Sequence, residues 1–104
     1  MGSLREIFGG SAQVKVLEFL VENHKEAKMM SEVAAGAKVA NSTTSRVIEP
    51  LVQSGIVKET RIGKQIRMFR LNVEDEKAKL LLRLTEGIRK LEDERQASQV
   101  VSDR

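Results

Sequence analysis

The chain has 104 residues and a mass of 11.6 kDa, which suits one small domain and is too short for two domains or a stack of repeats. Hydrophobic residues make up 40% and charged residues 32%, so the sequence has enough apolar side chains for a core and is not typical of a disordered tail. Cysteine is missing, which excludes disulfides, thiolate nucleophiles and thiolate zinc sites.

The chain has no stretch that approaches the roughly 18 consecutive apolar residues of a membrane helix. The first eight residues also lack the apolar core of a secretion signal. We therefore expect a protein of the cytoplasm that has no membrane partner.

Catalysis finds little support in the sequence. The single histidine, His24, lies beside Glu22, Lys25 and Glu26, a pattern typical of a solvated helix end. No serine stands in a nucleophile elbow, and no glycine-rich phosphate loop is present. We expect a protein that is not an enzyme and that uses no metal and no cofactor.

The positive charge is concentrated in one third of the chain. Overall the formal net charge is +3. Residues 38–70 hold seven lysines and arginines but only two glutamates, a local charge of +5, so the remainder carries −2. Such clustering favours a protein that binds a polyanion, although solvated charges can also cluster by coincidence.

The N-terminal ten residues are expected to form a short arm whose apolar face packs on another surface. The members of this face are Leu4, Ile7 and Phe8. Apolar residues at helical spacing then predict a helix over residues 12–23 with Ser11 as its N-cap, followed by a brief extended stretch at 27–30.

Two shorter helices follow. Ser31 is expected to cap a helix with the body 33–37. After a tight link, Asn41 or Ser42 is expected to cap a third helix that runs to residue 54, with Gly55 as the left-handed residue behind it. The inward stripe of this third helix is Thr44, Ile48 and Leu51.

A β-hairpin is predicted next. Aliphatic residues alternate with charges over 56–62 and 65–71, and Gly63-Lys64 supplies a two-residue turn. If Phe69 and Leu71 face the core, the tip presents cations to solvent. These cations are Arg61, Lys64 and Arg67.

The last predicted helix covers residues 73–97, is capped by Asn72 and is followed by a frayed tail over 98–104. It has apolar surface on more than one face, so we expect it to pair with a second copy as a coiled coil, although it could also wrap its own domain. The residues expected at this dimer contact are Leu81, Leu84, Ile88 and Leu91, together with the apolar face of the arm.

The order helix, short helix, tight turn, helix and hairpin is that of a helix-turn-helix followed by a wing. Four sequences add to this pattern: MSEVA at 30–34, NSTTSRVI at 41–48, SGIV at 54–57 and FRLN at 69–72. With them, residues 12–72 closely resemble prokaryotic winged-helix transcriptional regulators of the ArsR and MarR-like superfamily. Position 38 departs from the pattern, because it is lysine where the family often has glycine.

The resemblance implies an α+β, mostly α fold: a winged helix-turn-helix domain over 11–72 with a β-hairpin wing and a long C-terminal dimerisation helix. It also implies that residues of about 42–54 enter the major groove of DNA while the wing lies on phosphates or in a minor groove. The candidates for base contact are Ser42, Thr43, Ser45 and Arg46. The candidates for phosphate or minor-groove contact are Lys38, Asn41, Lys58, Arg61, Lys64, Arg67 and Arg70.

Physical arguments support double-stranded DNA as the partner. Short hydroxyl side chains and one arginine suit the approach of a helix to base edges. Arg46 fits a guanine or a phosphate equally well, and the serines and threonines could also act only in capping. Single-strand binding is less favoured, because there is no Trp or Tyr and the three phenylalanines, at 8, 19 and 69, fall on inward stripes.

The favoured interpretation is a homodimeric, sequence-specific transcriptional regulator of the nucleoid that reads a near-palindromic site. One alternative is an architectural or partition-type DNA-binding protein with little base readout. Another is a winged-helix module for protein–protein interaction. The sequence does not indicate whether an effector ligand exists.

Overall fold

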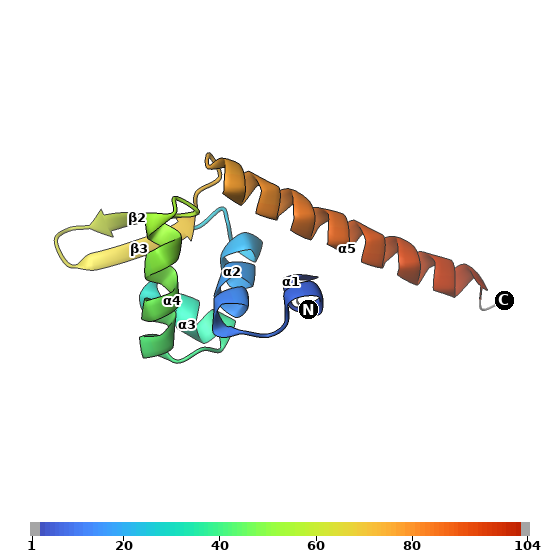
Figure 1. Ribbon diagram of the computed structural model, residues 1–104, viewed down its shortest axis with the longest axis horizontal. Helices are drawn as coiled ribbons and strands as arrows, with labels where there is room; N and C mark the ends of the chain where they lie inside the picture. The colour runs from blue at the N-terminus through green and yellow to red at the C-terminus, as the bar shows by residue number, and fades with distance from the viewer. Residues whose placement is uncertain (1–2, 103–104) are drawn as a thin grey trace.

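The computed structural model describes residues 3–102, with side chains for residues 4–95. In this part of the chain, helices pack at the base of a small sheet, and the loop of its hairpin projects away from them (Figure 1). The elements are α1 (Ser3–Phe8), α2 (Ala12–Glu22), β1 (Lys28–Met29), α3 (Met30–Ala37), α4 (Asn41–Gln53), β2 (Val57–Ile62), β3 (Ile66–Leu71) and α5 (Glu76–Ser102). The expected α+β, mostly helical fold class is confirmed.

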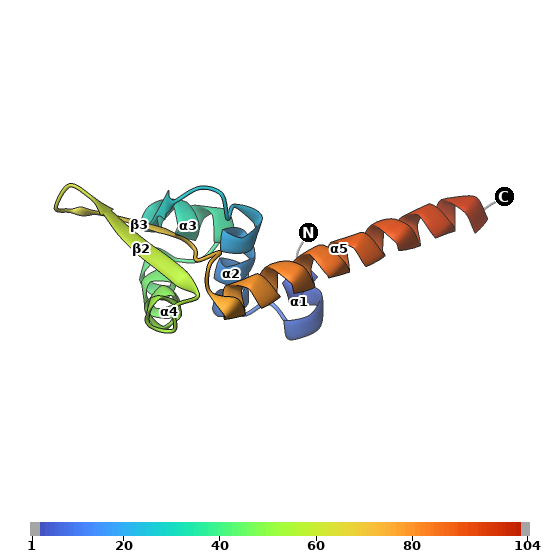
Figure 2. The same ribbon diagram turned by 90° about the horizontal axis from the view of Figure 1, so that it is seen from above.

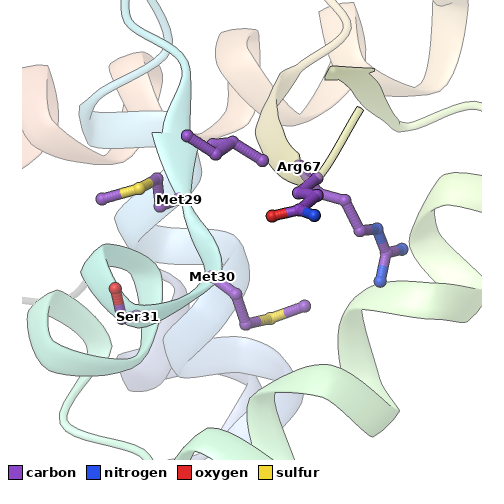
Figure 3. Close-up of a pocket in the computed structure, with 6 residues that line it drawn as sticks. Met29, Met30, Ser31 and Arg67 are labelled. Atoms are coloured by element: carbon purple, nitrogen blue, oxygen red, sulfur yellow. The ribbon is translucent and has the colours of Figure 1, made fainter. Parts of the chain in front are cut away.

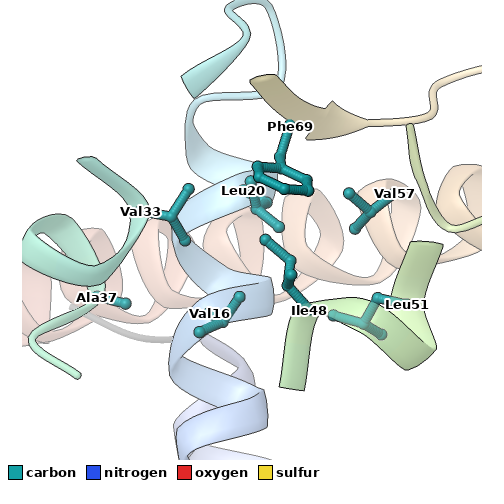
Figure 4. Packing of buried hydrophobic residues seen from close by; sticks show 8 residues of the cluster. All are labelled: Val16, Leu20, Val33, Ala37, Ile48, Leu51, Val57 and Phe69. Carbon is teal, nitrogen blue, oxygen red and sulfur yellow. The ribbon is translucent and has the colours of Figure 1, made fainter. Parts of the chain in front are cut away.

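One hydrophobic core joins α2, α3 and α4 to the base of the sheet. Phe69 of β3 lies over Leu20 of α2 and Ile48 of α4, and all three side chains are fully buried (Figure 4). The remaining core members are Val16, Val33, Ala37, Leu51 and Val57. Because three of these elements meet at Phe69, the core fixes α4 relative to the hairpin.

The arm is held to the body by a buried carboxylate. Glu18 of α2 is only 4% exposed. It accepts a hydrogen bond from the Arg5 backbone N–H at 3.0 Å and one from the Arg5 Nε at 2.8 Å. Leu4, 2% exposed, is buried beside this pair. The sequence did not indicate this contact, which attaches α1 to α2.

The starts of two helices differ from expectation. Met29, not Ser31, is the N-cap of α3, and its backbone N–H donates to the Glu32 carboxylate at 2.8 Å. The N-cap of α4 is Ala40, not Asn41 or Ser42, and it makes no side-chain cap. Ser11 caps α2 as predicted, since its hydroxyl accepts from the N–H of Val14.

The turn between α3 and α4 passes through Lys38 in the left-handed conformation, with φ 61° and ψ 48°. This conformation costs a residue with a Cβ roughly 1–2 kcal/mol. We expect Lys38→Gly to raise the free energy of unfolding by about 0.5–1 kcal/mol, after the entropy that glycine gains in the unfolded chain is deducted. Urea unfolding measures it. Lys38→Ala is the control, because it removes the same charge but keeps the Cβ; an equal gain there would contradict this reason.

The sheet has three antiparallel strands in the order β1-β3-β2, one more than the predicted hairpin. Ile62 pairs with Ile66, so the loop has three residues, 63–65, and the expected two-residue turn is wrong by one residue. Gly63, with φ 65°, begins the loop in the left-handed region as predicted. The extra loop residue changes which side chains oppose each other across the hairpin.

The long helix α5 begins at Glu76, after a cap that was not predicted. The Asp75 carboxylate accepts from the N–H of Ala78 at 3.0 Å, while the expected cap, Asn72, donates to the Gly55 carbonyl at 3.0 Å. The helix continues to Ser102 and so includes residues 98–102 of the expected tail, and residues 103–104 lie outside the described part.

The C-terminal half of α5 leaves the body. Figures 1 and 2 show it passing α2 and α1 and then continuing alone. The molecule is accordingly elongated, with extents of 60 × 28 × 21 Å. Among the described helices, none combines the length and apolar character needed to cross a membrane.

Candidate nucleic-acid interface

The helix α4 buries one face in the core, and its first two turns are exposed on the opposite face. Thr44 and Ile48 are fully buried and Leu51 nearly so, as the predicted stripe requires. Of the candidate base-contact residues on the first two turns, Ser42 and Arg46 lie on the opposite side, and Thr43 and Ser45 lie on the two flanks between that side and the buried stripe. Ser42 and Arg46 are exposed, and Thr43 and Ser45 are half-buried.

Capping does not occupy these polar side chains. Within α4 the hydroxyl that bonds the backbone is that of Thr44, which donates to the Ala40 carbonyl at 2.9 Å. Among the described residues, the hydroxyls of Ser42, Thr43 and Ser45 have no hydrogen-bond partner. The first turns of α4 therefore present free donors and acceptors, which the capping interpretation does not explain.

Most of the predicted phosphate-contact residues are exposed and free of carboxylates. In the part of the chain with described side chains, no ion pair forms at Lys38, Lys58, Lys64 or Arg70, and Asn41 is likewise exposed. Arg61 is exposed but lies 3.5 Å from the Glu59 carboxylate. The free cations lie on the α3–α4 turn and on the hairpin, where Lys64 is in the loop and Lys58 and Arg70 are on the face directed away from α4.

Arg67 corrects a prediction, because it does not present its charge at the hairpin tip. Its guanidinium donates to Glu59 at 2.9 and 3.1 Å and to Glu49 of α4 at 2.7 Å. It also lies 5.1 Å from the centroid of the Phe69 ring, a cation–π distance. Figure 3 shows the side chain extending from β3 towards α4. Arg67 thus joins both strands of the hairpin to α4 instead of remaining free for phosphate.

The Arg67 guanidinium lowers the pKa of Glu59 below its ordinary value of 4.5, and the largest cause is its hydrogen bonding to the carboxylate. A carboxylate of this kind stabilises the fold fully above its unfolded pKa and loses that contribution as the pH falls through its lowered pKa. We expect Glu59→Gln to lower the free energy of unfolding at about pH 7, and to lower it progressively less below about pH 4.5. Urea unfolding over this range measures the difference. Glu74→Gln, at an exposed site, is the control; a pH-independent cost at Glu59 would contradict the ion pair.

The residues expected at a dimer contact fall into two groups. Leu4 is buried in its own chain and Leu81 packs near Val21, Leu71 and Ala78, so their assignment to an intermolecular contact is not supported. Exposed apolar side chains remain at Ile7, Phe8, Leu84 and Leu91, and Ile88 is half-buried.

One exposed residue of α5 was missed, because Leu80 is 59% exposed and was not among the residues expected at the dimer contact. Phe8 was expected at that contact and also on an inward stripe; its side chain is 59% exposed, so the inward placement is wrong. Helical spacing could have identified Leu80, because it shares a side of α5 with Leu84 and Leu91.

No group of three or more His, Asp or Glu side chains in the described part of the chain is placed to hold a metal ion. The candidate site is therefore built from hydroxyls, guanidinium groups and ammonium groups around α4 and the hairpin.

Comparison with known proteins finds similar folds among solved structures. No protein-family model matches the chain. No curated protein matches it either. Among solved structures, RV1404 from Mycobacterium tuberculosis is similar with a TM-score of 0.66 at 18% identity, over 93% of this chain and 65% of that one. The MarR family transcriptional regulator SPO1453 from Silicibacter pomeroyi DSS-3 is similar with a TM-score of 0.62 at 20% identity, over 88% and 62%.

The fold is a winged helix-turn-helix. In this winged helix-turn-helix, α3 and α4 form the helix-turn-helix and β2–β3 form the wing. A third similar structure, the DNA-binding protein Sso10a-2 from Sulfolobus solfataricus, has a TM-score of 0.55 at 20% identity, over 86% of this chain and 90% of that one. The chain thus spans under two thirds of the length of the first two proteins but nearly all of the third.

Proposed function

We propose that this protein is a transcriptional regulator that binds double-stranded DNA at specific sequences in the cytoplasm. The observation that carries the proposal is the free polar surface on the first turns of α4. Ser42 and Arg46 are exposed there, and the hydroxyls nearby make no bond within the described part of the chain. A major groove about 12 Å wide admits one helix with such side chains.

Positive charges on the turn before α4 and on the wing suit contacts to DNA phosphates. Lys38 lies on the turn before α4, and Lys58, Lys64 and Arg70 lie on the wing. Each phosphate neutralised contributes about −0.9 to the slope of log K against log salt. Binding through these four cations should therefore be strongly weakened by salt. Arg67 has no part in this count, since two carboxylates already hold its guanidinium.

The names of similar structures support the same proposal. SPO1453 is described as a MarR family transcriptional regulator and Sso10a-2 as a DNA-binding protein. Each is 20% identical to this chain, so the likeness itself establishes the fold. The proposal of DNA binding rests on the exposed residues of α4 and the wing.

We also propose that the protein acts as a homodimer on a near-palindromic site. The support is the exposed apolar side of α5 at Leu80, Leu84 and Leu91, and the apolar residues of α1 at Ile7 and Phe8. A second copy would bury both and would place two α4 helices on one duplex.

An architectural DNA-binding function is the second candidate. One observation favours it. This chain matches 90% of the length of Sso10a-2, and that protein is named as a DNA-binding protein without mention of regulation. Cooperative coating of long duplexes, with a stoichiometry that rises with duplex length, would distinguish it from site-specific regulation.

Selection of bound duplexes from a random pool tests the proposal, with Arg46→Ala and Lys64→Ala as a matched pair. We expect the wild type to select a motif, and Arg46→Ala to lose discrimination worth about 1–3 kcal/mol at one position. Lys64→Ala should weaken all duplexes alike and reduce the salt slope by about 0.9. If the wild type selects no motif, sequence-specific regulation is wrong. If Arg46→Ala selects the wild-type motif unchanged, Arg46 does not read a base.

A further inference from the structure

The two faces of the wing differ in what they contact. Side chains alternate along a strand, so Glu59, Arg67 and Phe69 lie on the face towards the core and α4. The outer face carries the alternate residues. These are Lys58, Thr60 and Ile62 from β2 and Ile66, Met68 and Arg70 from β3.

An exposed apolar pair ends this outer face. Ile62 and Ile66 are cross-strand partners at the loop end of the hairpin, and they are 59% and 46% exposed. Their neighbours on the same face continue the apolar surface, because Met68 follows Ile66 on β3 and pairs with the exposed Met29 of β1. A shallow hollow lined by Met29, Met30, Ser31, Gln65, Ile66 and Arg67 borders it (Figure 3).

The core of the protein does not require this pair. Neither isoleucine belongs to the hydrophobic core, which reaches the sheet through Val57, Phe69 and Leu71. Exposed isoleucines on a hairpin are a hazard for edge-to-edge association, which proteins usually avoid with charged or polar residues. Their position points to a partner that covers them.

The charge around the pair indicates the kind of partner. Lys64 lies in the loop between the isoleucines, and Lys58 and Arg70 lie on the same outer face nearer the base of the hairpin, beyond Thr60 and Met68. The hairpin's acidic residue, Glu59, is on the inner face and is bonded to Arg67. This face of the hairpin therefore has an apolar tip, one cation beside it in the loop, two cations at its base and no carboxylate, which complements a polyanion with an apolar interior. In the minor groove of DNA, phosphates flank stacked bases in this way.

We propose that Ile62 and Ile66 form an apolar wedge that enters the minor groove and bends the duplex, so that the protein deforms DNA as well as reading it. The proposal rests on the DNA-binding function proposed above. The hairpin projects from the body at the end opposite the free part of α5, so its tip is accessible (Figures 1 and 2). Apolar side chains of this kind partly unstack a base step and kink DNA away from the minor groove.

The wedge implies a preference that needs no hydrogen bond to a base. Pyrimidine–purine steps unstack most easily, so TA or CA steps are expected beneath the wing at a fixed distance from the positions that α4 reads. The lysines and arginine around the pair would hold the flanking phosphates.

Fluorescence resonance energy transfer between the ends of a selected duplex tests the wedge. The wild type is expected to raise the transfer efficiency, and 2-aminopurine at the TA step to brighten on unstacking. The double variant Ile62→Thr/Ile66→Thr keeps β-branched side chains suited to strands. It is expected to bind roughly 10-fold more weakly, with the bend and the brightening lost and the salt slope unchanged. Ile62→Val/Ile66→Val keeps apolar side chains and is expected to retain most of the bend.

Lys64→Ala is the matched control, because it should reduce the salt slope and leave the bend in place. Far-ultraviolet circular dichroism and urea unfolding establish that each variant is folded. A threonine variant that bends DNA as the wild type does overturns the wedge. A threonine variant that no longer self-associates but still bends DNA also overturns it, because the isoleucine pair would then be a contact between protein chains. If the wild type selects a motif that depends on Arg46 but leaves the duplex straight, the wedge is wrong and the proposed function stands. If the wild type binds no duplex, both the wedge and the proposed function are wrong.

Discussion

Alanine in place of Gly36 is expected to lower the free energy of unfolding by about 1–3 kcal/mol, the range for overpacking a filled site. A Cβ at this position would lie 2.0, 2.4 and 2.6 Å from three carbons of the Phe19 ring, far inside van der Waals contact. The ring must swing out or α3 must move away from α2. Both responses disturb the packing of the two helices that support α4.

Gly87→Ala is the matched control for this change. Gly87 also lies within a helix, but a Cβ there meets nothing within 4 Å. Alanine should therefore raise the free energy of unfolding by about 0.5–1 kcal/mol through helix propensity alone. Urea unfolding of both variants separates the two effects by sign. Stabilisation of the Gly36 variant would show that the Phe19 ring moves at no cost.

The elements that local pattern determines were predictable from sequence. The spacing of Thr44, Ile48 and Leu51 gave the buried face of α4, and all three are buried. Gly55 was predicted as the left-handed residue after this helix, and its φ is 90°. Both signals lie within a few residues of the structure that they specify.

The helix starts were less predictable, because several residues near each start are good caps. Ser31, Asn41 and Asn72 all have side chains suited to an N-cap, yet packing of the flanking chain sets the first helical residue elsewhere. Asn72 instead bonds the Gly55 carbonyl, 17 residues away in sequence. Local capping preference carries no information about such a partner.

The environment of Arg67 was missed for a different reason. Alternation puts Arg67 on the same face as Phe69 and Leu71, so its inward position was present in the pattern. The predicted two-residue turn, however, would place Glu59 opposite Met68 rather than Phe69, on the other face from Arg67. A shift of one residue exchanges the two faces of a strand, and it therefore concealed the ion pair.

The proposed homodimer is expected to dissociate when Leu84 and Leu91 are both replaced by glutamate. These leucines are 38% and 63% exposed; Leu91 lies on the part of α5 that leaves the body, and Leu84 lies nearer the domain, on the same side of the helix as the exposed Leu80. Four charges brought together in a shared apolar contact would each lose hydration without a partner. A half-helix that packs on nothing is only marginally stable in water, so the monomer should also lose helicity.

Sedimentation velocity and circular dichroism at 222 nm measure both effects at equal chain concentration. Glu86→Lys is the control, because residue 86 lies about 200° around the helix from residue 84 and should leave the dimer intact. Binding to a two-half-site duplex should fall by about 10²–10⁴-fold for the double glutamate variant, since the second half-site would no longer be engaged by a linked partner. Binding to a single half-site should change little, because α4 and the wing are untouched. A wild type that sediments as a monomer, or a glutamate variant that keeps its affinity for the two-half-site duplex, would show that one chain suffices for recognition.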